Sequence, residues 1–114
     1  MNIELTKVKV KKGKSAVVDK WMALLNKEMD KVLLTLEDEK MYVETIFREV
    51  TGGEEFLYWY SIQGEGGALL AESKHEIDNL HIAYWEECID KEYEPVHMKN
   101  EVVMIQNKVM DVLQ

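Results

Sequence analysis

The sequence predicts an α+β fold of the ferredoxin-like type, a βαββαβ chain whose four-stranded antiparallel sheet carries two helices on one face. Strand-like and helix-like segments follow one another in the order strand, helix, strand, strand, helix, strand. Two βαβ units with right-handed crossovers fold most simply into this topology. The chain has 114 residues, which suffices for one core, so we expect a single domain over residues 1–114.

The beginning of the chain has the pattern of a strand followed by one long helix. Residues 2–10 mostly alternate and contain β-branched side chains, which predicts a strand. Ser15 is a suitable N-cap for the helix. The apolar stripe of this helix recurs at steps of three and four and consists of Val18, Trp21, Met22, Leu25, Met29, Val32, Leu33 and Leu36. The acidic residues 37–39 are expected to end the helix.

Two further strands are predicted at residues 41–50 and 55–63, because both segments are rich in β-branched and aromatic side chains. The pair Gly52-Gly53 between them predicts a hairpin turn. Residues 64–67, Gly-Glu-Gly-Gly, then interrupt the strand pattern. Their spacing matches neither a P-loop nor a dinucleotide-binding motif, so we interpret them as a flexible connection to the next helix.

The last part of the chain predicts a helix, a strand and an apolar tail. A short helical piece is expected at residues 68–73, and a second main helix from Glu76 to Lys91. Pro95, the only proline, follows that helix. Residues 101–106 are expected to form the last strand, and the tail at 109–113 is apolar enough to dock on the domain or on a partner.

The predicted sheet has two apolar faces, which a monomer of this fold does not explain. One face of the third strand carries Leu57 and Trp59. The other face carries Phe56, Tyr58, Tyr60 and Ile62. Helices cover only one face, and the open face of an antiparallel sheet should be polar. We therefore expect a homodimer in which the second faces of two sheets pack together as a closed α+β barrel. The alternative is a monomer with a partly exposed aromatic surface.

The stretches EDEKMYVETIFRE, EEFLYWYSIQG and IDNLHIAYWEECID resemble an uncharacterised family of short bacterial proteins in the dimeric α+β-barrel group. The resemblance extends over most of the chain and rests on patterns of aromatic residues. It implies the ferredoxin-like fold and dimeric assembly. It implies no particular activity, because the group includes quinol-type monooxygenases, haem-degrading enzymes, polyketide cyclases, relatives of chlorite dismutase and stress-responsive proteins without known catalysis.

The composition disfavours several classes of function. The formal net charge of −8 disfavours non-specific binding to nucleic acid or to an anionic membrane surface. The lysines among the first fourteen residues are interpreted as a solvated strand end rather than an anion site. We find neither an apolar segment long enough to span a bilayer nor a signal peptide, and the single cysteine, Cys88, has no internal partner. A cytoplasmic location is therefore expected.

His81 is the candidate catalytic residue, because it shares the apolar stripe of the second helix, where a titratable ring is unusual. Asp78 lies one turn earlier and is predicted to hold one ring nitrogen, so that the other faces the sheet as a general base. Tyr58 or Tyr60 would assist with a hydroxyl group. The alternative is a core histidine whose hydrogen bonds are satisfied by Asp78 or by a tyrosine.

Three other residues are candidates for ligand binding. Glu44 and Arg48 lie four apart on one face of the second strand, where they form either a clamp for a ligand carboxylate or an ion pair that sets the register of the dimer. Trp85 follows His81 by one turn and is expected to line the same space.

No metal site or cofactor is predicted. His75, Asp78 and His81 are spaced by three residues each, and on a helix this spacing spreads the side chains too widely for shared tight coordination. Cys88 lies two turns beyond His81, too far along the helix to share a metal with it. A lone histidine is also no signature of haem ligation.

Two functions remain open from the sequence. The first is a small cytoplasmic dimeric α+β-barrel protein that binds a small ligand between helix and sheet. The second is a cofactor-independent enzyme of the monooxygenase or cyclase type, acting on an aromatic or polyketide-like compound with His81 as general base.

Overall fold

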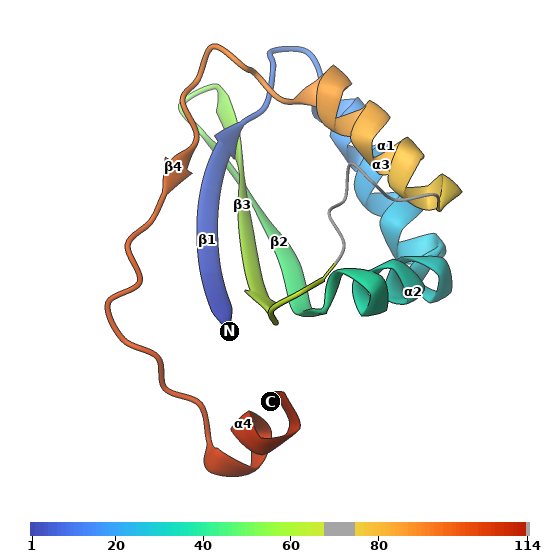
Figure 1. Cartoon of the computed structure of the whole chain (residues 1–114). Helices are drawn as coiled ribbons and strands as arrows, with labels where there is room; N and C mark the ends of the chain where they lie inside the picture. Colours follow the sequence, from blue (N-terminus) through green and yellow to red (C-terminus); the bar gives the residue numbers. More distant parts are fainter. Residues whose placement is uncertain (68–74, 114) are drawn as a thin grey trace.

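The computed structural model describes residues 1–67 and 75–113, and its elements confirm the predicted α+β fold. In this part of the chain they are β1 (Asn2–Lys9), α1 (Ser15–Lys27), α2 (Met29–Glu39), β2 (Met41–Thr51), β3 (Glu54–Gln63), α3 (Glu76–Cys88), β4 (Val96–His97) and α4 (Asn107–Leu113). The sheet has the order β2-β3-β1-β4, with all neighbours antiparallel. Figure 1 shows α1, α2 and α3 on one side of this sheet. The helical piece predicted at 68–73 lies outside the described residues.

The β2–β3 hairpin forms at the predicted glycine pair. Gly52 and Gly53 both have positive φ, 57° and 79°, and Thr51 pairs with Glu54 across the turn. Two successive positive φ angles define a two-residue type I′ turn, which glycine adopts at little cost. This turn sets the register of the two longest strands.

The register of the strands determines which side chains face the helices. β1 pairs with β3 so that Val8 lies opposite Leu57 and Glu4 lies opposite Ser61. β2 pairs with β3 so that Glu44 also lies opposite Ser61. Since successive side chains of a strand alternate between faces, these residues share the helix-facing side. The core packed there consists of Val8, Val10, Val18, Trp21, Leu57, Cys88 and Ile89.

The long helix predicted over residues 15–36 is in fact two helices. α1 ends at Lys27 and α2 begins at Met29, because Glu28 between them has the non-helical angles φ −99° and ψ 30°. The Glu28 N–H still donates to the Leu24 carbonyl. Neither Pro nor Gly, the usual sequence marks of a helix break, occurs here, and the apolar stripe continues across it. As a result α2 runs across one end of the sheet (Figure 1).

The second main helix ends earlier than predicted, at Cys88 instead of Lys91. Ile89 has extended angles and forms a bridge with Val10. The backbone N–H of Lys11 donates to the Cys88 carbonyl at 2.8 Å. The end of α3 is therefore tied to the strand end beside it, a long-range contact that helix periodicity does not reveal.

The C-terminal segment also differs from the prediction. The fourth strand consists of Val96–His97, paired with β1, and residues 101–106 form no strand. The Met98 N–H donates to the Leu5 carbonyl, and beyond this point the chain runs away from the sheet to α4 (Figure 1). We call residues 98–113 the C-terminal arm. Several of its apolar side chains are exposed, among them Val102 at 68%, Met104 at 85% and Val112 at 82%. None of the described helices is long and apolar enough to cross a membrane.

Candidate functional site

The helix-facing side of the sheet changes from apolar to polar along the strands. At one end Val8 and Leu57 are completely buried. Two residues further along, Thr6 lies opposite Trp59, and after two more residues a row of Glu4, Ser61 and Glu44 crosses three strands. We call these the packed end and the polar end of the helix–sheet layer. Glu4 and Glu44 are both exposed, so the helix–sheet layer is open to solvent at this end instead of packed.

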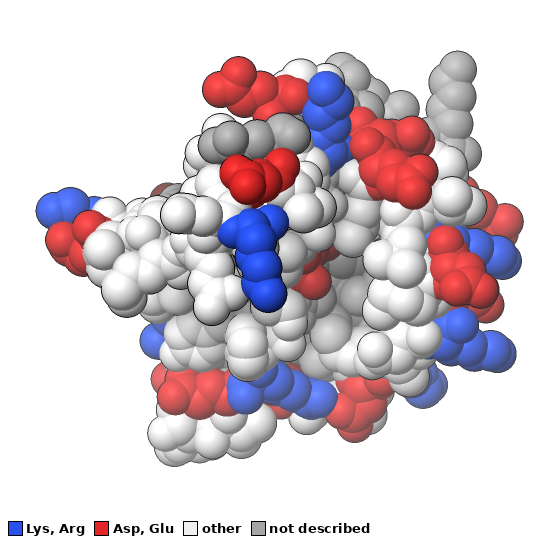
Figure 2. Space-filling model, turned by 90° about the horizontal axis from the view of Figure 1, so that it is seen from below, with Lys and Arg blue, Asp and Glu red and all other residues white. Residues whose placement is uncertain are grey.

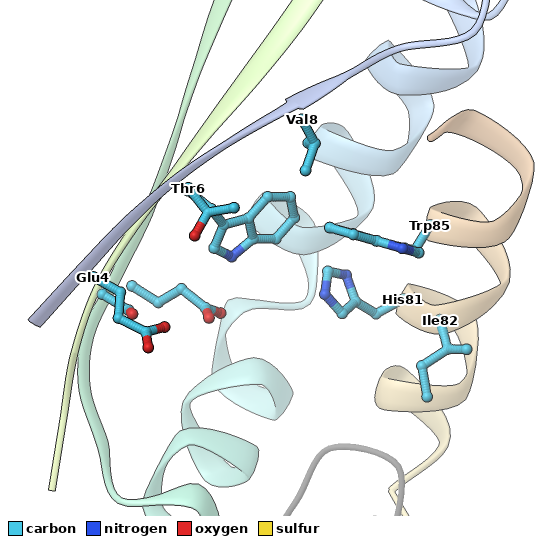
Figure 3. Close-up of a pocket in the computed structure, with 9 residues that line it drawn as sticks. Glu4, Thr6, Val8, His81, Ile82 and Trp85 are labelled. Carbon is cyan, nitrogen blue, oxygen red and sulfur yellow. The ribbon is translucent and has the colours of Figure 1, made fainter. Parts of the chain in front are cut away.

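A cavity of about 340 Å³ opens between the polar end of the sheet and α3. It is lined by Glu4, Thr6, Val8, Glu44, Trp59 and Ser61 from the sheet and by His81, Ile82 and Trp85 from α3. In Figure 3 the rings of His81 and Trp85 lie beside each other and project from α3 towards the sheet. A cavity of this size with apolar walls and a few polar groups is typical of small-molecule sites.

A second cavity, of about 290 Å³, lies next to the first and shares Glu44 and His81 with it. α1 and α2 supply most of its apolar wall, and Glu39 and Asp78 supply further carboxylates. Figure 2 shows that this end of the molecule is hollowed, with acidic atoms visible inside the hollow. Glu44 and His81 therefore stand where the two cavities meet.

Trp21, not Asp78, holds the ring of His81. The Trp21 Nε1–H donates to His81 Nδ1 at 2.9 Å. Because Nδ1 accepts this bond, the proton of the neutral ring is on Nε2, on the other side of the ring. Burial lowers the pKa of His81, while the Asp78 charge acts in the opposite direction. At neutral pH His81 is thus neutral, and the residue bonded to its ring is Trp21 and not the predicted Asp78.

Asp78 is buried, with 6% of its surface exposed. Its Oδ2 atom has no hydrogen-bond partner among the residues that the structure describes. A buried carboxylate oxygen without a donor is costly, of the order of 1–3 kcal/mol. A hydrogen bond to His81 therefore does not explain the burial of the Asp78 side chain.

Glu44 has the environment of an acid–base group. It keeps contact with solvent through the cavities, yet protein surrounds it closely enough that burial raises the pKa of its carboxyl group. A hydrogen bond with the Trp59 side chain opposes this effect, and the Asp78 charge adds to it. A carboxyl group with a raised pKa in a partly apolar cavity is better suited to exchange a proton with a ligand than a fully solvated one.

Glu39, the last residue of α2, is an acid that the sequence analysis did not single out. Burial, followed by the charges of Asp78, Glu44 and Asp38, raises its pKa to about 7, and His75 acts in the opposite direction. The backbone comes close at this point, because a Cβ atom on Gly67 would lie 1.9 Å from the Glu39 carbonyl oxygen. Only glycine at position 67 allows this approach.

Tyr58 and Tyr60 lie on the other face of the sheet from His81. They alternate with Leu57 and Trp59, which face the helices. The Tyr58 hydroxyl donates to the Glu49 carboxylate at 2.7 Å. Neither phenol therefore reaches the ring within one chain, and Trp59 occupies the place that the sequence analysis assigned to a tyrosine.

Arg48 is a structural residue, not part of either cavity. Its guanidinium group bonds the Asp19 carboxylate, the Glu55 carboxylate and Ser15 at the start of α1. It does not pair with Glu44, because the two residues lie at opposite ends of the helix-facing side, Arg48 opposite Leu57 and Glu44 opposite Ser61. Arg48 and Glu44 therefore do not form the predicted ion pair, because their positions along β2 bring them next to different residues.

The described residues contain no cluster of three or more His, Cys, Asp or Glu side chains arranged for a metal ion. His97 lies in β4, where its Nδ1 is 3.1 Å from the Thr6 hydroxyl. Cys88 is completely buried in the packed end, and burial raises the pKa of its thiol. It is therefore a core residue rather than a nucleophile.

The site also contains residues that were not predicted from the sequence: Trp21, Trp59, Ser61, Glu4 and Glu39. One signal was present, since Ser61 interrupts an otherwise apolar strand. Trp21 was assigned to the apolar stripe, and nothing in its spacing shows that its N–H meets a histidine sixty residues later.

Residues 1–111 match the model of a family described as a family of unknown function, DUF6176. None of the curated proteins matches the sequence. Among solved structures, a crystal structure of L-rhamnose mutarotase from Formosa agariphila is similar, with a TM-score of 0.55 and 18% sequence identity. The match covers 94% of this chain and 100% of that one. At this identity the likeness concerns the ferredoxin-like fold alone.

Proposed function

The chain belongs to DUF6176, a family of unknown function, and we propose that it binds a small organic molecule without negative charge in the cavity between α3 and the sheet. The observation that carries this proposal is the combination of aromatic walls, Trp59 and Trp85, with Glu44 and His81 in the lining of one cavity. A ligand carboxylate or phosphate would face Glu44 and Glu4 without a basic partner among the described lining residues.

Filling the cavity tests the binding proposal. Ser61→Phe places a ring in the first cavity from the sheet side, and Ile82→Trp does so from α3, which covers the case in which one variant does not fold. In ligand-observed NMR with neutral aromatic fragments such as benzyl alcohol, we expect binding to the unmodified protein and its loss in both variants. Val50→Phe adds similar bulk at an exposed position outside both cavities and is the control. Equal binding by all four proteins would contradict the proposal.

A second candidate is catalysis of proton transfer, favoured by the two different groups at the junction of the cavities. The sequence analysis assigned the base to His81, in a monooxygenase- or cyclase-like enzyme acting on an aromatic or polyketide-like compound. The hydrogen bond from Trp21 to Nδ1 supports the reverse assignment. Glu44 accepts a proton from a C–H beside a carbonyl group, and the Nε2–H of His81 stabilises the enolate oxygen that forms.

Deuterium exchange tests this chemistry without knowledge of the substrate. An aryl ketone with an acidic C–H, such as 2-tetralone, would be incubated with the protein in D2O and followed by proton NMR. We expect exchange faster than in buffer alone, and its loss in Glu44→Gln. Exchange that persists in Glu44→Gln would assign the base elsewhere, and exchange at the buffer rate would remove the catalytic candidate. The sugar named for the structural neighbour is not carried over, because only the fold is shared at 18% identity.

We also propose that two copies associate through the outer face of the sheet, the side away from the helices. Phe47 is 59% exposed and Val43 is 38% exposed on this face, beside the half-buried Tyr58 and Tyr60. The C-terminal arm exposes further apolar side chains, and a helix of seven residues is not stable in water by itself. A second copy provides both a cover for the face and a surface for the arm.

Mass measurement tests the assembly. We expect light scattering to report twice the chain mass of 13.3 kDa, and a monomer for Phe47→Asp or for a chain truncated after Met98. Glu37→Gln, an exposed change on α2, is the control. A protein that stays at 13.3 kDa at high concentration would rule out the dimer.

A further inference from the structure

We propose that the two cavities beside His81 form one binding site for a small organic cation, a protonated amine with an aromatic or aliphatic body. This inference rests on the proposed function and names its ligand class. The ammonium group would lie near Glu44, where the cavities meet, and the apolar body would lie against Trp59 and Trp85.

The first argument is the charge of the lining. Glu4 and Glu44 line the first cavity, and Glu39, Glu44 and Asp78 line the second. No Lys or Arg lines either cavity among the described residues. Four carboxyl groups, with no Lys or Arg among the described lining residues, favour cations over anions in these cavities.

The second argument is the unsatisfied oxygen of Asp78. This side chain is more than nine-tenths buried, lines the second cavity, and has no partner for Oδ2 among the described residues. An ammonium group carries several N–H donors and would supply the missing hydrogen bond together with a compensating charge. A ligand that is apolar, or that only accepts hydrogen bonds, would leave the Asp78 Oδ2 atom without a hydrogen bond.

The third argument is the aromatic wall. The rings of Trp59 and Trp85 meet edge to face with centroids 5.3 Å apart, and both line the first cavity. Tryptophan faces attract cations through their quadrupole, and this attraction grows when water is excluded. His81 adds no opposing charge, because burial lowers its pKa and its Nδ1 atom accepts the hydrogen bond from Trp21.

Protonation provides a consequence that can be measured. Glu39 has a pKa of about 7 and the pKa of Glu44 is raised, in both cases with burial as the main cause and like charges adding to it. A bound cation favours the ionised form of both carboxyl groups. Binding near pH 7 should therefore release protons to the buffer.

The test compares three probes of nearly equal shape: benzylamine, benzyl alcohol and benzoate. By calorimetry we expect benzylamine, protonated near pH 7, to bind at least about tenfold more tightly than benzyl alcohol, as charge-assisted hydrogen bonds predict, and benzoate not to bind. Heats in buffers of different ionisation enthalpy should show proton release. Benzyl alcohol binding as well as benzylamine would overturn the cation site while leaving the cavity proposal intact. No binding by benzylamine would overturn it as well.

Two variants locate the site. Glu44→Gln and Asp78→Asn should each weaken benzylamine binding about tenfold or more, with little change for benzyl alcohol. Glu37→Gln removes an exposed carboxylate from the same helix as Glu39 and should change neither. Equal weakening of both probes would indicate altered cavity shape and overturn the assignment of charge recognition. Two variants are used because Asp78 is buried, so that the result for Glu44→Gln decides the test if Asp78→Asn does not fold.

Discussion

The packed end and the polar end of the helix–sheet layer are built by the same strands and helices, yet they differ in every respect that matters for function. At the packed end Val8, Leu57 and Trp21 are buried to 1% exposure or less. At the polar end the corresponding positions hold Glu4, Ser61 and Glu44, and two cavities remain. The side chains that fill the core and the polar side chains that line the cavities thus lie about four residues apart on the same strands.

The sharpest way to test this separation is a matched pair of truncations on β3. Leu57→Ala should cost about 3 kcal/mol or more of unfolding free energy, because it leaves a void in a filled core. Ser61→Ala should cost less than about 1 kcal/mol, since its side chain borders an existing cavity. Urea denaturation followed by tryptophan fluorescence measures both. Similar losses at the two positions would show that the ends are not distinct.

Trp21 joins the two ends, so its replacement should affect both. Trp21→Phe keeps an aromatic ring in the core but removes the N–H that donates to His81, and we expect a loss of about 2 kcal/mol. Without this donor the protonated form of His81 is less disfavoured, so its pKa should rise. NMR titration of the ring protons checks this. An unchanged titration would mean that burial alone holds His81 neutral.

Two groups of the polar end give opposite dependences of stability on pH. The pKa of His81 is lowered in the folded state, so the unfolded chain takes up a proton first and stability should fall as the pH decreases below about 6.5. The pKa of Glu39 is raised from 4.5 to about 7, so the folded state holds the extra proton and stability should fall as the pH rises through this window.

Glu39→Gln separates these contributions. Above pH 7 the variant should be more stable than the unmodified protein, because no charge has to be buried. The difference should shrink as the pH falls through 4.5, below which Glu39 is mostly protonated in both states. Thermal unfolding across this range measures it, with Glu37→Gln as control. A constant difference at all pH values would assign the effect to packing.

The smallest expected effect concerns the backbone where α2 turns into β2. Lys40 has the left-handed angles φ 52° and ψ 36°, which cost a residue with a Cβ atom about 1 kcal/mol. Lys40→Gly should therefore stabilise the protein by about 0.5–1 kcal/mol, measured by urea denaturation. Destabilisation would show that the Lys40 side chain supports the polar end.

Local sequence patterns were sufficient where neighbours in the chain determine structure. The alternation in residues 2–10, the apolar spacing around Trp21 and the pair Gly52-Gly53 each act over a few residues, and a strand, a helix and a hairpin turn form at these positions. The break at Glu28 and the departure of the C-terminal arm were missed. The break carries no Pro or Gly, and residues 101–106 have the local properties of a strand but pair with no strand in the described part of the chain.

His81, Glu44 and Trp85 were candidate site residues in the sequence, and all three line one cavity. Their roles depended on partners that spacing does not reveal. Asp78 lies one turn from His81 and was the obvious partner, yet Trp21 of another helix makes the bond. Arg48 lies four residues from Glu44 on the same face of β2, yet its guanidinium group bonds Asp19 and Ser15 of α1.

By itself, the sequence determined the order of strands and helices, the hairpin and the apolar stripes, because these follow from interactions between residues close in the chain. Only the tertiary structure decided that Glu4, Ser61 and Glu44 form one row and that His81 is held neutral. The physical reason is strand register. Shifting one strand by a single residue would turn its side chains to the other face and remove the site.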